Sequence, residues 1–300
     1  MRFWLSLVAV RETEQLPELA LLAEELGFHG LMVGDHLLWP AHITTRYPYS
    51  PDGKIFVPPD TPWPDPWVLF AHLGAIARRL HFASNIYLAA LRDPFTVAKS
   101  VATAAVLTGD RIVCGVSAGW LGEEYRLVGV DFDTRGARLD ETLAVVSKLW
   151  SGQVVQHAGA HFRFEGSVLP APGKRVRIWC GGSAPAAMRR AARHDGWLPL
   201  PLTVAQTRAA LERIRVMRAD AGLAEARFEV ALPLAEPVTQ AAVEELHTLG
   251  VADLVVIAPW LPSPWDPLAW LERGEDPARL DVKKKALERY AASVLARVQR

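Results

Sequence analysis

The feature that most constrains the fold of this chain is a regular alternation of short apolar runs with longer segments of helical period. Eight runs are rich in β-branched or apolar residues, as strand interiors are, and they lie at residues 2–9, 30–34, 81–87, 111–116, 176–180, 196–200, 227–232 and 252–258. Helical patterns fill intervals between them, at residues 16–26, 94–107, 184–194, 204–221 and 238–249. Strands that alternate with helices in this way form parallel sheets.

Eight such repeats in 300 residues predict an α/β fold, a (β/α)8 TIM barrel that forms a single domain over residues 1–300. An open, doubly wound sheet with the same number of strands is the competing arrangement. Residues 153–165 read as a small hairpin outside the barrel, and residues 280–300 as a C-terminal helix that closes it.

A long insertion follows the second predicted strand. Residues 39–67 contain eight prolines and no regular periodicity. A structureless segment of this length in a compact domain is usually functional, often as a lid or as a wall of a binding site.

Composition excludes several classes of protein. Acidic and basic residues balance at 33 each, so the chain lacks the basic excess that nucleic-acid binding needs. The apolar N-terminus is too short for a membrane span and runs directly into Arg11 and Glu12, which argues against a signal peptide. Cys114 and Cys180 each lie in an apolar run, as buried thiols do, so we expect a cytoplasmic protein without a disulfide.

The candidate site follows from the barrel, because the loops after the strands converge at one end and build the active site there. Polar, aromatic and glycine residues gather at the predicted strand ends. They are Asp35, His36 and Trp39 after the second strand, Asn85 and Ile86 after the third, Ser117, Gly119 and Trp120 after the fourth, Gly181, Gly182 and Ser183 after the fifth, and Trp260 after the eighth. This clustering predicts a ligand pocket.

Two of these segments have a direct chemical reading. The Gly181-Gly182-Ser183 corner precedes a helix, and glycines at a helix N-terminus let backbone N–H groups approach a phosphate closely. An ordinary tight turn is the equally simple alternative. The imidazole of His36 could donate or accept a proton beside a bound ring, although a histidine beside Asp35 could also be purely structural.

The tryptophans at the strand ends allow a similar choice. Trp39 and Trp120 could stack on a planar cofactor or substrate, and Trp260 could line the same pocket. For Trp39 and Trp120 the competing reading is that they belong to the hydrophobic core, where tryptophans are common.

Two alternatives to a redox enzyme remain open. Residues 115–119 match the G-x-S-x-G nucleophile elbow with Ser117 as nucleophile, yet no later histidine lies where an α/β-hydrolase needs its base. A barrel that binds a ligand without turnover is the second alternative. We expect no metal site, because His157 and His161 lie in a segment without helical period and no carboxylate cluster accompanies them.

Several segments, in this order, resemble the bacterial luciferase-like superfamily, and within it the actinobacterial F420-dependent oxidoreductases. They are residues 25–30 leading to 34–36, the loop 46–53, and residues 91–94, 109–111, 119–125, 135–141, 181–183 and 195–197. The resemblance extends from residue 1 to about residue 260.

The resemblance implies a (β/α)8 barrel, usually a homodimer, that carries FMN or the deazaflavin F420 at the C-terminal ends of its strands. It places Asp35 and His36 near the reactive face of the ring, as catalytic residues. Asn85 and Ile86 would form a bulge with a non-prolyl cis peptide behind the ring. Gly181, Gly182 and Ser183 would line the phosphate site, with Ser117, Gly119 and Trp120 completing the cofactor pocket.

The cofactor decides the reaction that the resemblance implies. FMN-dependent luciferases place an arginine in the fourth-strand turn, where this chain has Ala118, and an acidic residue in the fifth-strand turn, where it has glycine. Both departures favour coenzyme F420, and with it an oxidoreductase that transfers hydride to or from a small organic substrate. An FMN-dependent monooxygenase is the alternative.

Overall fold

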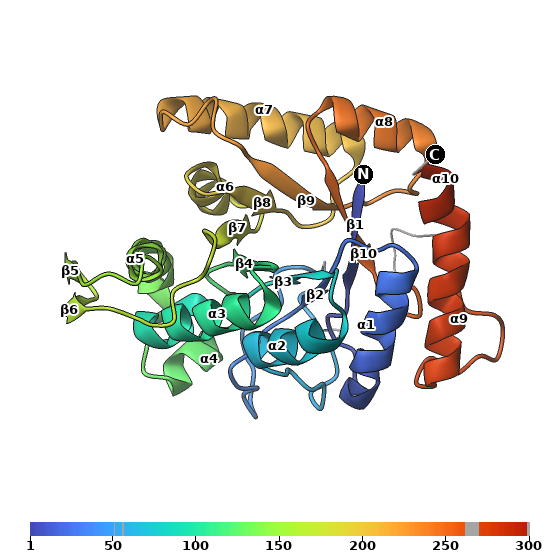
Figure 1. The fold of residues 1–300 in the computed structure, drawn as a ribbon, viewed down its shortest axis with the longest axis horizontal. Helices are drawn as coiled ribbons and strands as arrows, with labels where there is room; N and C mark the ends of the chain where they lie inside the picture. The colour runs from blue at the N-terminus through green and yellow to red at the C-terminus, as the bar shows by residue number, and fades with distance from the viewer. Residues whose placement is uncertain (51, 56, 262–269, 299–300) are drawn as a thin grey trace.

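The eight predicted strands form one closed, parallel barrel. The structure, a computed structural model, describes residues 1–50, 52–55, 57–261 and 270–298. Within them the strands are hydrogen-bonded in the order β1-β10-β9-β8-β7-β4-β3-β2, and β2 returns to β1 (Figure 1). The (β/α)8 barrel is confirmed, and the open sheet is excluded. The barrel strands are β1 (Arg2–Ser6), β2 (Gly30–Val33), β3 (His81–Ser84), β4 (Ile112–Val116), β7 (Arg177–Gly181), β8 (Gly196–Leu198), β9 (Glu229–Pro233) and β10 (Asp253–Ile257).

Helices cover the outside of the barrel, as Figure 1 shows. They are α1 (Leu16–Glu25), α2 (Pro66–Ile76), α3 (Pro94–Thr108), α4 (Gly122–Leu127), α5 (Arg135–Leu149), α6 (Pro185–Ala192), α7 (Val204–Asp220), α8 (Gln240–Thr248), α9 (Leu280–Tyr290) and α10 (Ala296–Val298). Short turns of helix lie at η1 (Thr13–Gln15), η2 (Ala89–Leu91), η3 (Phe132–Thr134) and η4 (Ala291–Leu295). No helix among the described residues is both long and apolar enough to cross a bilayer.

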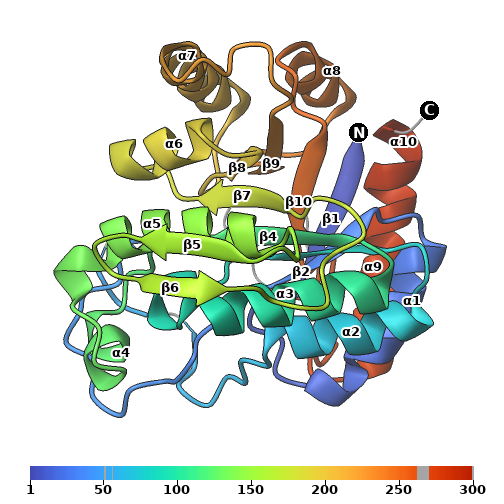
Figure 2. The same ribbon diagram turned by 60° about the vertical axis from the view of Figure 1, so that its left-hand side comes forward.

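The additions to the basic repeat are where the sequence predicts them. Strands β5 (Val155–Ala158) and β6 (Arg163–Gly166) pair antiparallel as the hairpin, which lies at the left edge of Figure 1, away from the barrel, and comes to the front in Figure 2. The loop predicted at residues 39–67 contains no strand or helix among its described residues until Pro66, so its last two residues belong to α2. The closing helix begins at Leu280 as predicted, while its last two residues, 299–300, lie outside the described part of the chain, as does Pro51 of the loop.

One residue from each strand fills the barrel interior. These residues are Trp4, Met32, Ala83, Val113, Trp179, Leu198, Ala231 and Val255, all nearly or fully buried. The two indole rings require space on the neighbouring strands: a Cβ at Gly30 would lie 2.5 Å from the Trp4 ring, and one at Gly196 would lie 2.4 Å from the Trp179 ring. The interior is therefore a packed core, and any ligand must bind at a mouth of the barrel.

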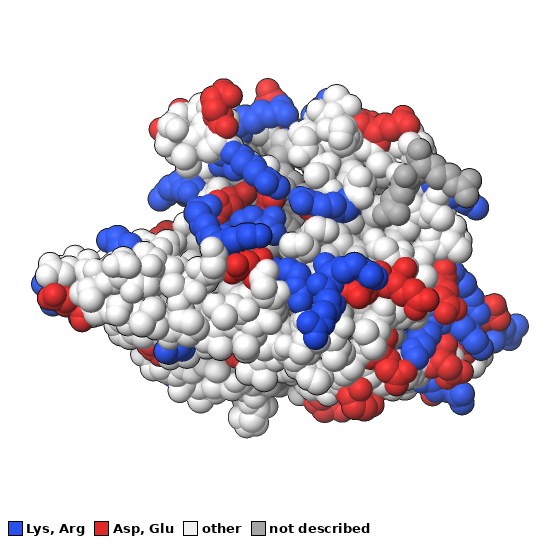
Figure 3. Space-filling view, viewed as in Figure 1, with Lys and Arg blue, Asp and Glu red and all other residues white. Residues whose placement is uncertain are grey.

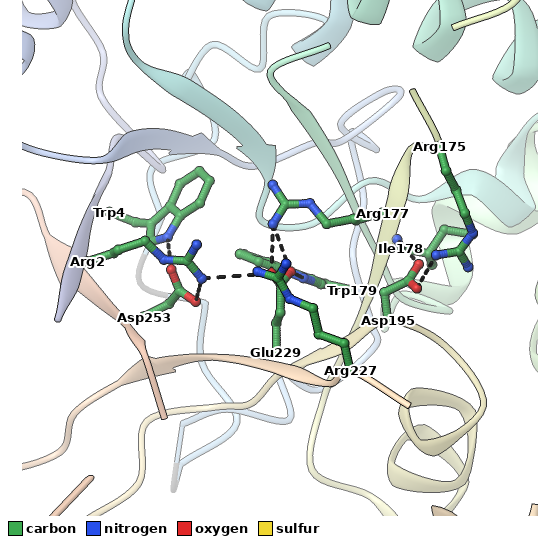
Figure 4. A network of polar contacts seen from close by, with 10 residues as sticks. All are labelled: Arg2, Trp4, Arg175, Arg177, Ile178, Trp179, Asp195, Arg227, Glu229 and Asp253. Atoms are coloured by element: carbon green, nitrogen blue, oxygen red, sulfur yellow. Dashed lines mark hydrogen bonds and ion pairs between the residues drawn. The ribbon is translucent and has the colours of Figure 1, made fainter. Parts of the chain in front are cut away.

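The N-terminal ends of the strands are joined by hydrogen bonds and ion pairs to two buried carboxylates, Asp253 and Glu229 (Figure 4). Trp4 Nε1 donates to Asp253 at 2.8 Å and Trp179 Nε1 donates to Glu229 at 2.9 Å, so each core indole carries a carboxylate at its polar edge. Arg177 then binds both oxygens of Glu229 at 2.8 and 2.9 Å. These contacts connect β1, β7, β9 and β10 at the N-terminal end of the barrel. In TIM barrels this end usually stabilises the fold, whereas the active site lies at the other end.

A stacked histidine pair at this end predicts a loss of stability in mild acid. The rings of His29 and His81 lie 4.5 Å apart, and burial, with Arg2 and Arg177 nearby, lowers the pKa of each to about 4. An unfolded chain binds these protons near pH 6.5, so it holds more protons than the folded protein between pH 6.5 and about 4. The contribution of this pair to the free energy of unfolding should therefore be fully present above pH 6.5 and should decrease as the pH falls through this window.

Urea unfolding at a series of pH values checks this prediction. The double variant His29→Gln/His81→Gln cannot titrate in this window, so its stability should change less between pH 6.5 and 5 than that of the wild type. Equal slopes for the two proteins would contradict it. Carboxylates titrate mainly below this range and affect both proteins alike.

Candidate functional site

The residues predicted at the ends of β2, β3 and β7 lie against one another at the opposite mouth of the barrel. The backbone N–H of Asn85 donates to Val33 O at 2.6 Å. A Cβ at Gly34 would lie 2.8 Å from the Trp63 ring and 3.5 Å from Asn85 O. A Cβ at Gly181 would lie 3.0 Å from Ile86 Cδ1, so the end of β7 packs tightly against the Ile86 side chain.

The bulge predicted after β3 is present. The Asn85–Ile86 peptide bond is cis although its second residue is not proline, which confirms the expected geometry at these two residues. Strand β3 ends at Ser84, earlier than the predicted residue 87. Tyr87 returns to the barrel edge beside Val116 of β4.

Asp35 is held in an ion pair. Arg92 donates to its two carboxylate oxygens at 2.8 and 2.9 Å, and the backbone N–H of Leu88 donates at 3.0 Å. Asp35 is 5% exposed, and burial raises its pKa, although Arg92 acts in the opposite direction. Both oxygens of Asp35 are therefore occupied in joining the segment after β2 to the segment after β3.

His36 is held by a buried carboxylate. Its Nδ1 lies 3.0 Å from Glu124 Oε2, while Glu124 Oε1 accepts from the backbone N–H groups of Leu37 at 2.6 Å and Leu38 at 3.3 Å. Glu124 is fully buried. Because a carboxylate only accepts, the Nδ1 of His36 carries the hydrogen, and Nε2 is the ring nitrogen that remains for a ligand. Within the described residues His36 Nε2 makes no hydrogen bond.

The adjacent glutamate holds the long loop. Glu123 Oε1 accepts from the backbone N–H and hydroxyl of Thr44 at 2.9 and 2.6 Å, and Oε2 accepts from the Thr45 hydroxyl at 2.7 Å. Burial would raise the pKa of Glu123, but these hydrogen bonds lower it to about 2. Glu123 and Glu124 occupy the first turn of α4, where a negative charge is favourable, and together they fix the loop over the barrel mouth.

Aromatic rings surround His36. The His36 ring lies edge-on to Trp39 at 5.0 Å, to Trp63 at 4.8 Å and to Trp120 at 6.3 Å. Trp120 in turn contacts Tyr47 at 4.9 Å, and Tyr47 contacts Tyr49 at 5.1 Å. We call these five aromatic residues the aromatic patch: Trp39, Tyr47, Tyr49, Trp63 and Trp120. All of them remain partly exposed, so they are not core residues.

The turn after β4 does not support the hydrolase alternative. Ser117 is 9% exposed, and its hydroxyl accepts a hydrogen bond from the backbone N–H of Gly119 at 3.2 Å. Among the described residues no histidine hydrogen-bonds to this hydroxyl. The carbonyl of Ala118 accepts from Tyr125 at 2.6 Å, which orders the turn from below.

The glycine corner after β7 is only partly available to a ligand. The N–H of Gly182 donates to Leu198 O at 3.1 Å, and its carbonyl accepts from Trp197 Nε1 at 2.8 Å, so the amide of Gly182 serves the barrel. The Ser183 hydroxyl accepts from Leu200 N at 3.3 Å. Helix α6 begins after Ala184 without a side-chain cap, which leaves N–H groups of its first turn for an anion.

The other predicted residue at the mouth is Trp260, which the structure buries. It is 1% exposed, whereas Trp39 and Trp120 are partly exposed, so it belongs to the core around the barrel and not to the aromatic patch. The predicted place of Trp260 in a substrate pocket gains no support from this position. Among the described residues, no group of three or more His, Cys, Asp or Glu side chains is arranged to hold a metal ion. Cys114 and Cys180 are free and buried, as predicted.

Sequence reasoning missed Glu124, Arg92, Trp63 and Tyr47. Glu124 is separated from His36 by 88 residues, and Arg92 from Asp35 by 57, so no local pattern connects them. A signal was available for Tyr47, which lies in a tyrosine-proline-tyrosine segment of the long loop.

Comparison with known proteins gives a family. Residues 3–291 match the family described as luciferase-like monooxygenases. An uncharacterised protein of Mycobacterium tuberculosis is 32% identical over 281 residues, which are 93% of this chain and 94% of that protein.

Two solved structures share the fold. A monooxygenase from Streptomyces bottropensis has a TM-score of 0.72 at 18% identity and covers 99% of both chains. The coenzyme F420-dependent tetrahydromethanopterin reductase of Methanopyrus kandleri has a TM-score of 0.70 at 14% identity and covers 98% of both chains. At these identities the likeness concerns the fold alone.

Proposed function

The chain belongs to the luciferase-like monooxygenase family, and from that membership and the geometry of the barrel mouth we propose that it is an oxidoreductase that uses coenzyme F420. It transfers hydride to or from a small organic substrate. An FMN-dependent monooxygenase is the second candidate, since the proteins with this fold include both a monooxygenase and an F420-dependent reductase.

The barrel mouth fits a flat ring with a phosphate-bearing tail. A Cβ at Gly181 would meet the Ile86 side chain at 3.0 Å, so the cis bulge and the glycine corner lie in contact and form the floor of the mouth. Beside this floor, the uncapped start of α6 offers backbone N–H groups and the positive end of a helix dipole. In this proposal Asn85 and Ile86 support the ring, and Ser183 with the first turn of α6 holds the phosphate.

The deazaflavin, when bound, supplies a two-electron hydride carrier that reacts poorly with oxygen. A side chain of the protein transfers the proton. Glu124 fixes the Nδ1–H tautomer of His36, so Nε2 takes up a proton from the substrate, or returns it, according to the direction of the reaction. Asp35 has no oxygen left for proton transfer, and we assign it the role of positioning His36 through its ion pair with Arg92.

Titration of the protein with F420 and, separately, with FMN tests the proposal. Binding is followed by the fluorescence of each ring. Tight F420 binding with weak FMN binding is expected, and the reverse would replace the reductase by a monooxygenase. Binding of neither would favour a barrel without redox function.

The phosphate assignment predicts opposite effects of one substitution on stability and on binding. Ala184 is the N-cap of α6 and has extended backbone angles (φ −66°, ψ 151°), as Asp93 has before Pro94 in α3. Ala184→Asp should cap the helix and raise the free energy of unfolding by about 0.5–2 kcal/mol. Its negative charge should weaken cofactor binding at least about tenfold, which is about 1.4 kcal/mol.

Ala184→Asn is the matched control for this prediction. It caps the helix without a charge, so it should stabilise the protein to a similar extent with a smaller loss of affinity. Thermal unfolding and cofactor titration measure the two effects. Unchanged cofactor affinity in Ala184→Asp would contradict the proposal that the start of α6 binds the phosphate.

A homodimer also remains part of the proposal. Helix α2 contains no charged residue, and Val68, Val106 and Leu107 on α2 and α3 are 71%, 45% and 62% exposed. These helices pack against each other, and Figure 3 shows mostly uncharged atoms where α3 lies in Figure 1. Such a face supports self-association, which sedimentation velocity measures.

A further inference from the structure

The walls of the proposed site are apolar. On the loop side they consist of the aromatic patch, with Tyr49 44% exposed and Leu37 43% exposed beside it. A chain seldom leaves this much aromatic and aliphatic surface uncovered in one place unless another molecule covers it. The rings of Trp39 and Trp63 are near-parallel, 16° apart with centroids 6.2 Å apart, so they stack on each other, and a planar molecule would stack on their outer faces.

The charged side chains around the patch are engaged with the protein itself. Asp35 pairs with Arg92, Glu123 binds Thr44 and Thr45, and Glu124 binds His36 and two backbone amides. No arginine or lysine of the described chain lies over the rings of Trp39, Trp63 or Trp120.

Among the described residues, Arg46 lies next to Tyr47 in the chain and donates to Asp52 O at 3.1 Å, so an anionic substrate would have to compete with that contact. Glu123 and Glu124 are 4% and 0% exposed, and both lie close beneath the loop. Their negative charges would repel a carboxylate or phosphate group, and desolvation of that group would add to the penalty.

A cationic substrate would lack a carboxylate partner at the patch, although aromatic rings often bind cations. The oxygens of Glu123 and Glu124 point to the loop, where Thr44, Thr45 and the backbone use them. Among the described residues, Glu123 and Glu124 are thus not left to pair with an ammonium group.

We propose that the substrate of this site is an uncharged molecule with an aromatic or polycyclic ring system, which stacks on Trp39, Trp63 and Trp120 beside His36 Nε2. This inference rests on the proposed function for the identity of the site. It adds the class of substrate, which comparison with relatives does not supply.

Equilibrium dialysis against three naphthalene probes of equal ring size tests the inference. The probes are 2-acetylnaphthalene, which is neutral, 2-naphthoate, which is anionic, and 2-naphthyltrimethylammonium, which is cationic. The measurement uses the protein alone and the protein saturated with whichever of F420 and FMN binds. We expect the neutral probe to bind at least about tenfold more tightly than either charged probe.

Substitutions locate the binding. Trp120→Ala should weaken binding of the neutral probe by about tenfold, and Trp120→Phe should restore most of it, because the ring face returns. Phe95→Ala, which removes a 41% exposed ring from α3 outside the site, should leave binding unchanged. Circular dichroism and thermal unfolding show that each variant is folded.

The outcomes separate this inference from the proposed function. Cofactor binding together with equal or tighter binding of 2-naphthoate, or of the cationic probe, would overturn the substrate class and leave the redox assignment in place. Binding of the neutral probe without binding of either cofactor would overturn the redox assignment and support the substrate class. Neutral-probe binding that Trp120→Ala does not weaken would overturn the stacking site.

Discussion

Replacing His36 by alanine should lower kcat by about 10²–10⁴-fold while cofactor affinity stays within a few fold of the wild type. The reason is the position of His36 at the mouth of the barrel. His36 is the titratable side chain at the mouth whose second ring nitrogen makes no hydrogen bond among the described residues, whereas Asp35, Glu123 and Glu124 are occupied. A general acid or base acts on the substrate proton and contributes to kcat, while the ring and phosphate of the cofactor bind elsewhere.

The measurement is steady-state turnover of an uncharged carbonyl compound with reduced F420, with cofactor binding measured separately. Glu124→Gln is the matched variant: the amide still accepts from Leu37 and Leu38, but it no longer fixes the tautomer of His36 by charge. We expect a smaller loss of kcat and a displaced pH profile. Normal turnover in His36→Ala would refute the proton-transfer role, and loss of cofactor binding would show a structural one.

The positions of the strands could be predicted because each strand is a short apolar run. Helix α2 does not stand out in the same way, because nearly all of its residues are apolar and no helical period appears. The alternation also predicts the mouth of the barrel, since parallel strands bring their C-terminal ends together. Strand-end residues such as His36 and Gly181 were located by this argument before any contact was known.

The pairing within the site could not be predicted by the same means. Whether His36 is free or held depends on Glu124, which follows β4 and a different loop, and burial at Trp260 depends on how the surrounding helices pack. Such contacts depend on how distant segments pack in three dimensions, and the periodicity of the sequence does not reveal this packing. The five-residue aromatic patch is of this kind, because it joins two distant points of the long loop to the turn after β4.

At the opposite end of the barrel, Glu229→Ala should lower the free energy of unfolding by about 3–5 kcal/mol. Glu229 is 5% exposed and accepts hydrogen bonds from Arg177, Arg227 and Trp179 Nε1 (Figure 4). Removal of the carboxylate leaves the Arg177 charge without its bidentate partner and a core indole N–H without an acceptor. Both penalties arise in the folded state, because water forms hydrogen bonds with these groups in the unfolded chain.

Arg175→Ala is the control for this prediction. Arg175 also pairs with an acidic residue at this end of the barrel, Asp195, but its side chain is 73% exposed, and surface pairs of this type contribute about 0–1 kcal/mol. Urea unfolding compares the two variants, and a loss below about 1 kcal/mol in Glu229→Ala would contradict the account of the network. Because Glu229 lies at the N-terminal end of β9, folded Glu229→Ala should bind cofactor with wild-type affinity, which separates the end of the barrel that stabilises the fold from the end that binds the ligand.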